Sequence, residues 1–149
     1  MSRLIKNYYT FNRSINFNFI PELLMNFNLE SAYKGNSKNE KILNSVFQLR
    51  KIQDHPLFEE FNKKIIKDFK ITSSWDLDMF LSFAPGASGN VHSDEYEVLI
   101  LNVLGIQCYK HGNENYILKP GDLISFKRGE PHQAIGIDPR ISLSFGYGF

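Results

Sequence analysis

The sequence predicts a mainly β protein with helices in its N-terminal part and a jelly roll in its C-terminal half. Two observations predict this fold. From residue 75 onwards, short alternating segments follow one another between glycine, proline and asparagine turns, with no helical period. Before that point, apolar residues recur at helical spacing between residues 40 and 69. A chain of 149 residues has room for one such domain and is too short for two, so we expect a single domain over 1–149, divided into 1–74 and 75–149.

The first third of the chain is predicted to mix strands and short helices. Residues 7–20 alternate loosely between apolar and polar side chains, which predicts one or two early strands. A short helix is expected over 21–25, because a proline is favoured in a first helical turn. A loop is expected at 35–39. Apolar residues at helical spacing then predict a helix over about 40–51, although its apolar stripe is imperfect.

A longer amphipathic helix is predicted from Asp54-His55-Pro56 to Phe69. Its apolar residues recur at helical spacing, its acidic residues lie early and its lysines lie late, as the helix dipole favours. We interpret it as a helix that covers one side of a sheet. His55 is assigned to the start of this helix and to no metal site.

The C-terminal half is predicted to consist of strands alone. The segment 75–83 alternates strictly, and a loop follows at 84–89. Further strands are predicted over 95–104, 106–110, 115–118, 122–126 and 140–147. Short strands separated by regular turns are typical of a barrel or jelly roll.

Composition excludes several classes of protein. The net charge is +1 and no basic tract is present, so nucleic-acid binding has no electrostatic support. No apolar run has membrane-spanning length, and the N-terminal residues do not form a signal peptide. The single cysteine, Cys108, allows no intrachain disulfide and fits a reducing compartment. We therefore expect a cytoplasmic protein.

The candidate functional residues are His92, Asp94 and His132. In an extended strand His92 and Asp94 point to the same face, because side chains alternate with a period of two. His132 follows Gly129-Glu130-Pro131, where a tight turn can deliver it into a barrel interior. Two imidazoles and one carboxylate hold one face of a metal ion and leave the other open, which suits iron(II). Glu97 falls on the opposite face of the strand unless a bulge intervenes.

Several blocks resemble known families. The pattern Gly121-x5-Lys127-x-Gly129-x2-His132 resembles the second motif of cupins, with Lys127 in place of the usual proline. The runs 80–86 and 92–105, with Leu118 to Phe126, Pro131-His132 and Ser142 to Gly146, are similar to JmjC-type oxygenases and most similar to the ribosomal-oxygenase branch. The similarity covers roughly residues 75–149 and depends on the order and spacing of several blocks.

The resemblance implies a double-stranded β-helix and an iron(II)- and 2-oxoglutarate-dependent dioxygenase, commonly one that hydroxylates a protein side chain. His92, Asp94 and His132 would be both the metal ligands and the catalytic residues. Some cupins add a glutamate near the position of Glu97, so a four-ligand site is an alternative.

The sequence departs from the family at the residue that binds the distal carboxylate of 2-oxoglutarate. The family has Lys or Arg two residues after the glycine matched by Gly105, and here that position is Gln107, which cannot neutralise a carboxylate. Arg140 is the alternative anchor. It shares one face of the last strand with Ser142 and Ser144, and the competing interpretation leaves Arg140 at the surface. Lys110 and Lys127 are weaker candidates.

Three function classes stay open at this point. The first is the 2-oxoglutarate-dependent hydroxylase, acting on a protein or other macromolecule rather than on a free small molecule. The second is a metal cupin of other chemistry, such as an isomerase or a 2-oxoglutarate-independent dioxygenase, which Gln107 favours. The third is a non-catalytic cupin binding module. Relatives carry further domains that this sequence lacks, which weakens the case for a ribosomal-protein substrate. Because cupins and these relatives often pair, a homodimer is compatible with the sequence.

Overall fold

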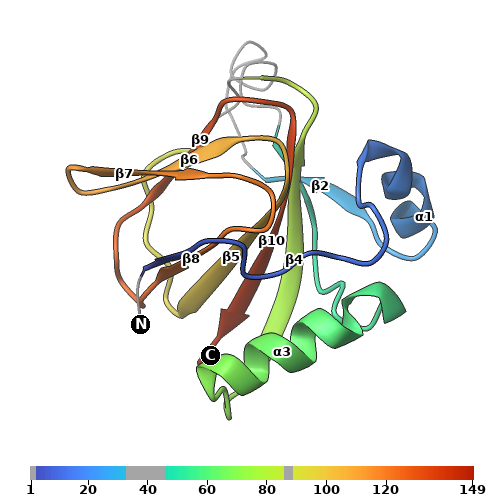
Figure 1. Cartoon of the computed structure of the whole chain (residues 1–149), viewed down its shortest axis with the longest axis horizontal. Coiled ribbons are helices and arrows are strands. Elements are labelled where there is room, and N and C mark those ends of the chain that lie inside the picture. Colours follow the sequence, from blue (N-terminus) through green and yellow to red (C-terminus); the bar gives the residue numbers. More distant parts are fainter. Residues whose placement is uncertain (1–2, 33–45, 86–88) are drawn as a thin grey trace.

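The computed structural model describes residues 3–32, 46–85 and 89–149. Two antiparallel sheets face each other, one with seven strands in the order β1-β8-β5-β10-β4-β3-β2 and one with three in the order β7-β6-β9 (Figure 1). The strands are β1 Leu4–Ile5, β2 Leu29–Ser31, β3 Phe47–Leu49, β4 Trp75–Ser82, β5 Glu97–Leu104, β6 Gln107–His111, β7 Glu114–Leu118, β8 Leu123–Phe126, β9 Gln133–Gly136 and β10 Arg140–Tyr147. The helices are η1 Phe17–Phe19, α1 Ile20–Leu24, η2 Pro56–Phe58 and α3 Glu59–Phe69. The predicted mainly β jelly roll is confirmed.

The large sheet separates two environments. Its central strand β10 pairs along its length with β4 on one side and β5 on the other. Because side chains alternate along a strand, one set faces α3 and the other faces the small sheet. The first set is apolar and buried, and it comprises Leu77, Met79, Leu81, Leu99, Leu101, Ile141, Leu143 and Phe145. The second set is mostly polar on β4 and β10 and lines a cavity between the sheets.

The predicted amphipathic helix is confirmed as η2 followed by α3. His55 begins it, because its Nδ1 accepts a hydrogen bond from the backbone N–H of Leu57 at 3.2 Å. Phe58, Phe61 and Ile65 are completely buried against the large sheet, and each contributes about 1.5–3 kcal/mol by leaving water. Figure 1 shows α1 and α3 on the side of the large sheet away from the small one.

The strands predicted over residues 7–20 are wrong. Only Leu4–Ile5 pairs with the sheet in this part of the chain, and residues 17–19 form a short 3-10 helix. The alternation of aromatic residues has another cause. The rings of Tyr9 and Phe11 lie 5.2 and 5.8 Å from the ring of Phe61. This irregular segment therefore packs alternate aromatic side chains against α3. The short helix near Pro21 is confirmed as Ile20–Leu24.

The helix predicted over 40–51 is wrong where the structure can be read. Residues 47–49 are the strand β3, which pairs with β2 and β4, because sheet pairing outweighs an imperfect helical stripe. The loop expected at 35–39 and the first part of this helix lie outside the described residues, as does the middle of the loop 84–89. The predicted strands from 75 onwards are confirmed, with β9 as an addition. Within the described ranges, no helix combines the length and apolar character needed to cross a membrane.

Candidate metal centre

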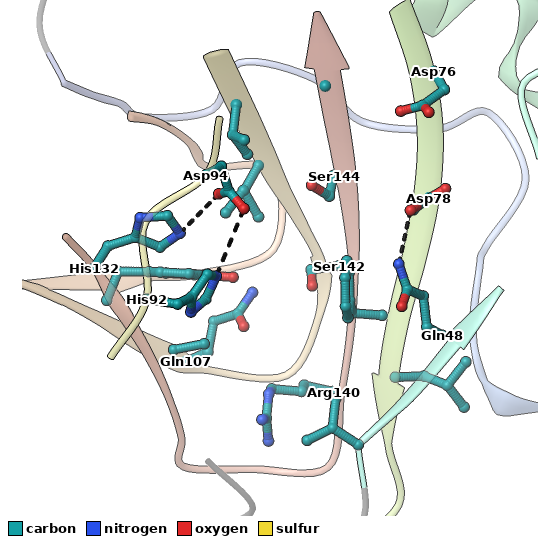
Figure 2. Close-up of a pocket in the computed structure, with 18 of the residues that line it drawn as sticks. Gln48, Asp76, Asp78, His92, Asp94, Gln107, His132, Arg140, Ser142 and Ser144 are labelled. Carbon is teal, nitrogen blue, oxygen red and sulfur yellow. Dashed lines mark hydrogen bonds and ion pairs between the residues drawn. The ribbon is translucent and has the colours of Figure 1, made fainter. Parts of the chain in front are cut away.

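A cavity of about 100 Å³ opens between the two sheets. A volume of this size holds on the order of seven to ten water-sized positions, which is enough for a small organic acid. Figure 2 shows His92, Asp94, His132 and Gln107 on one side of the cavity. Ser142, Ser144 and Arg140 project from β10 opposite them. The two sides of the cavity thus carry different kinds of polar side chain.

His92, Asp94 and His132 converge. His92 and His132 face each other in an isolated antiparallel bridge, with backbone hydrogen bonds of 3.0 Å and 2.8 Å. Nε2 of His132 lies 3.4 Å from Oδ2 of Asp94, and Nε2 of His92 lies 4.0 Å from Oδ1. The three potential ligand atoms lie within 4.8 Å of one another. A metal ion with bonds of about 2.1 Å can bridge such a group after small side-chain shifts.

The hydrogen bonds of both histidines fit metal binding. Nδ1 of His92 lies 3.0 Å from the carbonyl oxygen of Asn90, and Nδ1 of His132 lies 3.0 Å from that of Glu130. A carbonyl only accepts, so each Nδ1 carries the proton and each Nε2 presents its lone pair towards Asp94. Burial, and then the nearby His92, lower the pKa of His132 and favour its neutral form. The donor set therefore fits a divalent transition metal with an open face.

The local structure differs from the strand expected for His92 and Asp94. Both residues lie in an irregular segment before β5, with only the single bridge at His92. They converge because this bridge and a hydrogen bond from Gly129 N–H to the carbonyl of Asp94, 2.9 Å long, hold the segment against the turn that carries His132. Glu97 begins β5 and lies outside both the cavity lining and the metal-ligand group of the described chain. The four-ligand alternative therefore has no support.

The residues expected to anchor a carboxylate lie on the inner face of β10. Arg140, Ser142 and Ser144 line the cavity, and Arg140 is buried, with only 4% of its surface exposed. The alternative that Arg140 lies at the surface is wrong. Lys110 and Lys127 do not line the cavity. That these β10 residues bind a carboxylate stays a prediction.

Gln107 also lines the cavity, with an orientation fixed from behind. Nδ2 of Asn102 donates to the carbonyls of Gly105 and Leu118 at 2.7 and 3.1 Å, so its Oδ1 must be the acceptor for Nε2 of Gln107 at 2.9 Å. One Gln107 proton donor is thereby used, and Oε1 is available to a group in the cavity. An amide oxygen disfavours a carboxylate beside it, which makes Arg140 the better anchor.

An acidic wall was not predicted from the sequence. Asp76 and Asp78, on the inner face of β4, line the cavity. Asp78 accepts hydrogen bonds from Nε2 of Gln48 at 2.7 Å and from the backbone N–H of Lys51 at 2.8 Å (Figure 2). Burial, and then the charge of Asp78, raise the pKa of Asp76. The alternation of residues 75–83 places both aspartates on one face of the strand, but it gives no signal that this face lines a cavity.

Comparison with known proteins places the fold. A model of the cupin domain matches residues 79–140. The ribosomal oxygenase YcfD from Escherichia coli, in complex with cobalt and 2-oxoglutarate, has a similar structure with a TM-score of 0.76 and 18% identity, covering 98% of this chain and 47% of that chain. Its complex with cobalt and succinic acid gives 0.75 and 18%, with the same coverage. Comparison with curated proteins gave no match.

The chain spans about half the length of YcfD, with 47% of that protein covered. The cupin match covers the part of the chain that contains His92, Asp94, Gln107 and His132. Both comparisons agree with the jelly-roll architecture. Residues 79–140 therefore resemble a cupin domain, and the chain shares the jelly-roll fold of the ribosomal oxygenase YcfD.

Proposed function

We propose that the protein is an iron(II)- and 2-oxoglutarate-dependent dioxygenase that hydroxylates a side chain of a protein or another macromolecule. The observation that carries the proposal is the convergence of two imidazoles and one carboxylate at a cavity that also holds a buried arginine. The complex of YcfD with cobalt and 2-oxoglutarate supports it, since that protein has the same fold.

His92, Asp94 and His132 would hold the metal on one face and leave the other face towards the cavity. Iron held there would supply the chemistry that couples the oxidative decarboxylation of 2-oxoglutarate to the activation of dioxygen. The remaining task of the chain is to bind, orient and shield the reactants. The burial of His132, 3% exposed, excludes water from one side of the site.

Arg140 is the proposed partner of the distal carboxylate. Its planar guanidinium can form two parallel hydrogen bonds to a carboxylate, and burial strengthens them. Ser142 and Ser144, on the same face of β10, would donate further hydrogen bonds. Gln107 would contact the cosubstrate chain as a neutral neighbour. The proposed compartment is the reducing cytoplasm, where iron stays ferrous and the lone Cys108 stays a thiol.

A metal cupin that uses no 2-oxoglutarate is the second candidate. The observation in its favour is the amide of Gln107, with its oxygen available to the cavity, at the place where the resembling family has a cation. In that case the substrate itself would chelate the metal, and Arg140 would bind an acidic substrate.

Anaerobic titration of the iron(II)-loaded protein with 2-oxoglutarate tests the proposal. We expect a saturable visible charge-transfer band from the chelate. Asp94→Ala should abolish it, and Arg140→Met should weaken the affinity at least tenfold, because a buried charge-assisted pair is lost. Arg128→Met, in an exposed arginine outside the cavity, is the matched control and should behave as wild type.

Each alternative gives its own result. Tight iron binding without a band contradicts the 2-oxoglutarate proposal and supports the second candidate. Absence of iron binding contradicts both and leaves a binding module. Equal affinities of the wild type and Arg140→Met would remove Arg140 from the site while keeping the enzyme class.

A further inference from the structure

His132 is held more tightly than His92. Its ring stacks on Phe126 with a centroid distance of 4.2 Å and an interplanar angle of 8°. The hydrogen bond from Nδ1 to the carbonyl of Glu130 fixes the same ring at its edge. His92 has the corresponding edge contact, through Asn90, and a tilted contact with the His132 ring at 4.5 Å between centroids, but its side chain is 44% exposed. The direction of the His132 lone pair therefore depends on Phe126 and on the turn that contains Glu130.

Arg3 holds both of these supports. Its guanidinium lies 5.3 Å from the centroid of the Phe126 ring. It donates to both carboxylate oxygens of Glu130, at 2.8 and 2.9 Å, and to the carbonyl of Ser125 at 2.8 Å. These contacts join the end of β8 to the far side of the turn that leads to His132. One planar fork thus ties together the ring and the turn behind a single potential ligand.

The same turn reaches the other ligands. The backbone N–H of Lys127 donates to Oε2 of Glu130 at 2.8 Å, which closes the turn from within. Gly129 N–H donates to the carbonyl of Asp94 at 2.9 Å. A loosened Glu130 would therefore move the supports of both His132 and Asp94. The backbone anchors Arg3 in turn, because Ser125 N–H donates to its carbonyl at 2.9 Å and β1 pairs with β8.

We infer that Arg3 is a positioning residue of the metal centre. Resting on the proposed metal site, the inference makes the N-terminal strand part of that site: through Glu130 and Phe126, Arg3 sets the orientation of His132 and so the affinity and geometry of the bound metal. Partners behind a ligand typically change metal affinity by about 10- to 100-fold. Arg3 does not line the cavity, and it acts through its neighbours.

The chain offers a matched control at Arg13. Arg13 donates to both carboxylate oxygens of Glu22, at 3.2 and 2.7 Å, and its guanidinium lies 4.6 Å from the centroid of the Phe19 ring. These are the same two kinds of contact, an Arg–Glu fork and an aromatic ring, and none of these three residues lines the cavity. Arg13→Gln therefore removes a comparable group without touching the supports of His132.

Cobalt(II) titration of the full chain, followed by its visible absorption bands, is the test. We expect Arg3→Gln to weaken cobalt affinity about tenfold and to change the band positions or intensities. Arg3→Lys should recover only part of the affinity, since an ammonium cannot reproduce the planar fork. Arg13→Gln should leave affinity and spectrum unchanged. Unfolding temperatures without metal are measured for all variants, to separate stability from positioning.

The outcomes are distinguishable. Arg3→Gln with a lowered unfolding temperature but a wild-type affinity and spectrum would overturn the inference, because Arg3 would then be only structural. Should Arg3→Gln not fold, Phe126→Leu and Glu130→Gln replace it, and wild-type cobalt binding in both would overturn the inference equally. Failure of the wild type to bind cobalt would overturn the proposed function together with this inference.

Discussion

Gly105 joins β5 to β6 with a positive φ of 75°, and its Cα faces the backbone at the start of β10. A methyl group placed there overlaps the carbonyl oxygen of Pro139 and comes within 3.3 Å of the Cα of Arg140. Gly112, in the β6–β7 turn, also has a positive φ of 59°, but an added methyl group meets nothing within 4 Å. Gly105→Ala and Gly112→Ala therefore share a left-handed backbone conformation and differ in the room available to the added methyl group.

The structure gives the magnitude of the difference. Left-handed alanine costs about 1–2 kcal/mol, and the reduced entropy of the unfolded chain returns about 0.4–1 kcal/mol. Gly112→Ala should thus lose about 1 kcal/mol. In Gly105→Ala the Pro139 oxygen must also move by about 1 Å to reach an ordinary contact. That shift strains two hydrogen bonds of 3.1 Å between Ile106 and Asp138, worth about 1 kcal/mol each. We expect a total loss of about 3 kcal/mol.

Thermal and urea unfolding of the two variants measure this difference. In a protein of this size, 1 kcal/mol corresponds to about 2–4 °C, so Gly105→Ala should unfold about 4–8 °C below Gly112→Ala. The displacement of the start of β10 should also weaken the binding of any ligand that Arg140 contacts. Equal losses of unfolding free energy in the two variants would refute the reasoning, since the loss would then depend only on the positive φ that both positions share.

Three further outcomes are expected. Burial opposes ionisation of Asp122, but hydrogen bonds from Lys6 and two backbone amides outweigh it and lower the carboxyl pKa. Asp122→Asn should therefore cost about 2–3 kcal/mol at neutral pH. That gap should narrow in urea unfolding as the pH falls below about 4, because the Asp122 carboxyl of the unfolded chain takes up protons there while the folded one does so only at lower pH. Cobalt at 100 times its dissociation constant should stabilise the wild type by about 2.7 kcal/mol in a thermal shift, and Asp94→Ala should show no shift. Gln107→Lys, which adds a cation beside the cosubstrate, should bind 2-oxoglutarate about tenfold more tightly in the anaerobic titration, and an unchanged affinity would mean that residue 107 does not contact the cosubstrate.

The candidate metal-ligand residues could be predicted because their signal is local. The spacing of His92 and Asp94 and the turn before His132 are fixed by a few neighbouring residues, and the structure brings the three together. The supports behind them could not be predicted. Arg3 is far from His132 in sequence, and only the pairing of β1 with β8 brings it to the site.

The acidic wall formed by Asp76 and Asp78 shows a second limit of prediction from the sequence. Alternation predicts which residues share a face of a strand, but it does not say whether the polar face meets water or a cavity. On β4 the apolar residues pack against α3, so Asp76 and Asp78 point between the sheets. The early strands were wrong for a related reason, because Tyr9 and Phe11 alternate against a helix and not within a sheet.

The two apolar clusters on either side of the large sheet are unequal. Among the residues that the structure describes, the cluster towards α3 contains nineteen buried residues, whereas the one between the sheets contains six: Val98, Ile100, Tyr109, Leu118, Ile124 and Phe126. Much of the space that a core would fill between the sheets is instead the cavity. The three-stranded sheet should therefore open at a lower free energy than the rest of the protein. A metal bound to Asp94 and His132 joins the segments before β5 and β9, one strand of each sheet. Ligand binding should then appear in hydrogen exchange as slower amide exchange in β6, β7 and β9, with β4 and β10 almost unchanged.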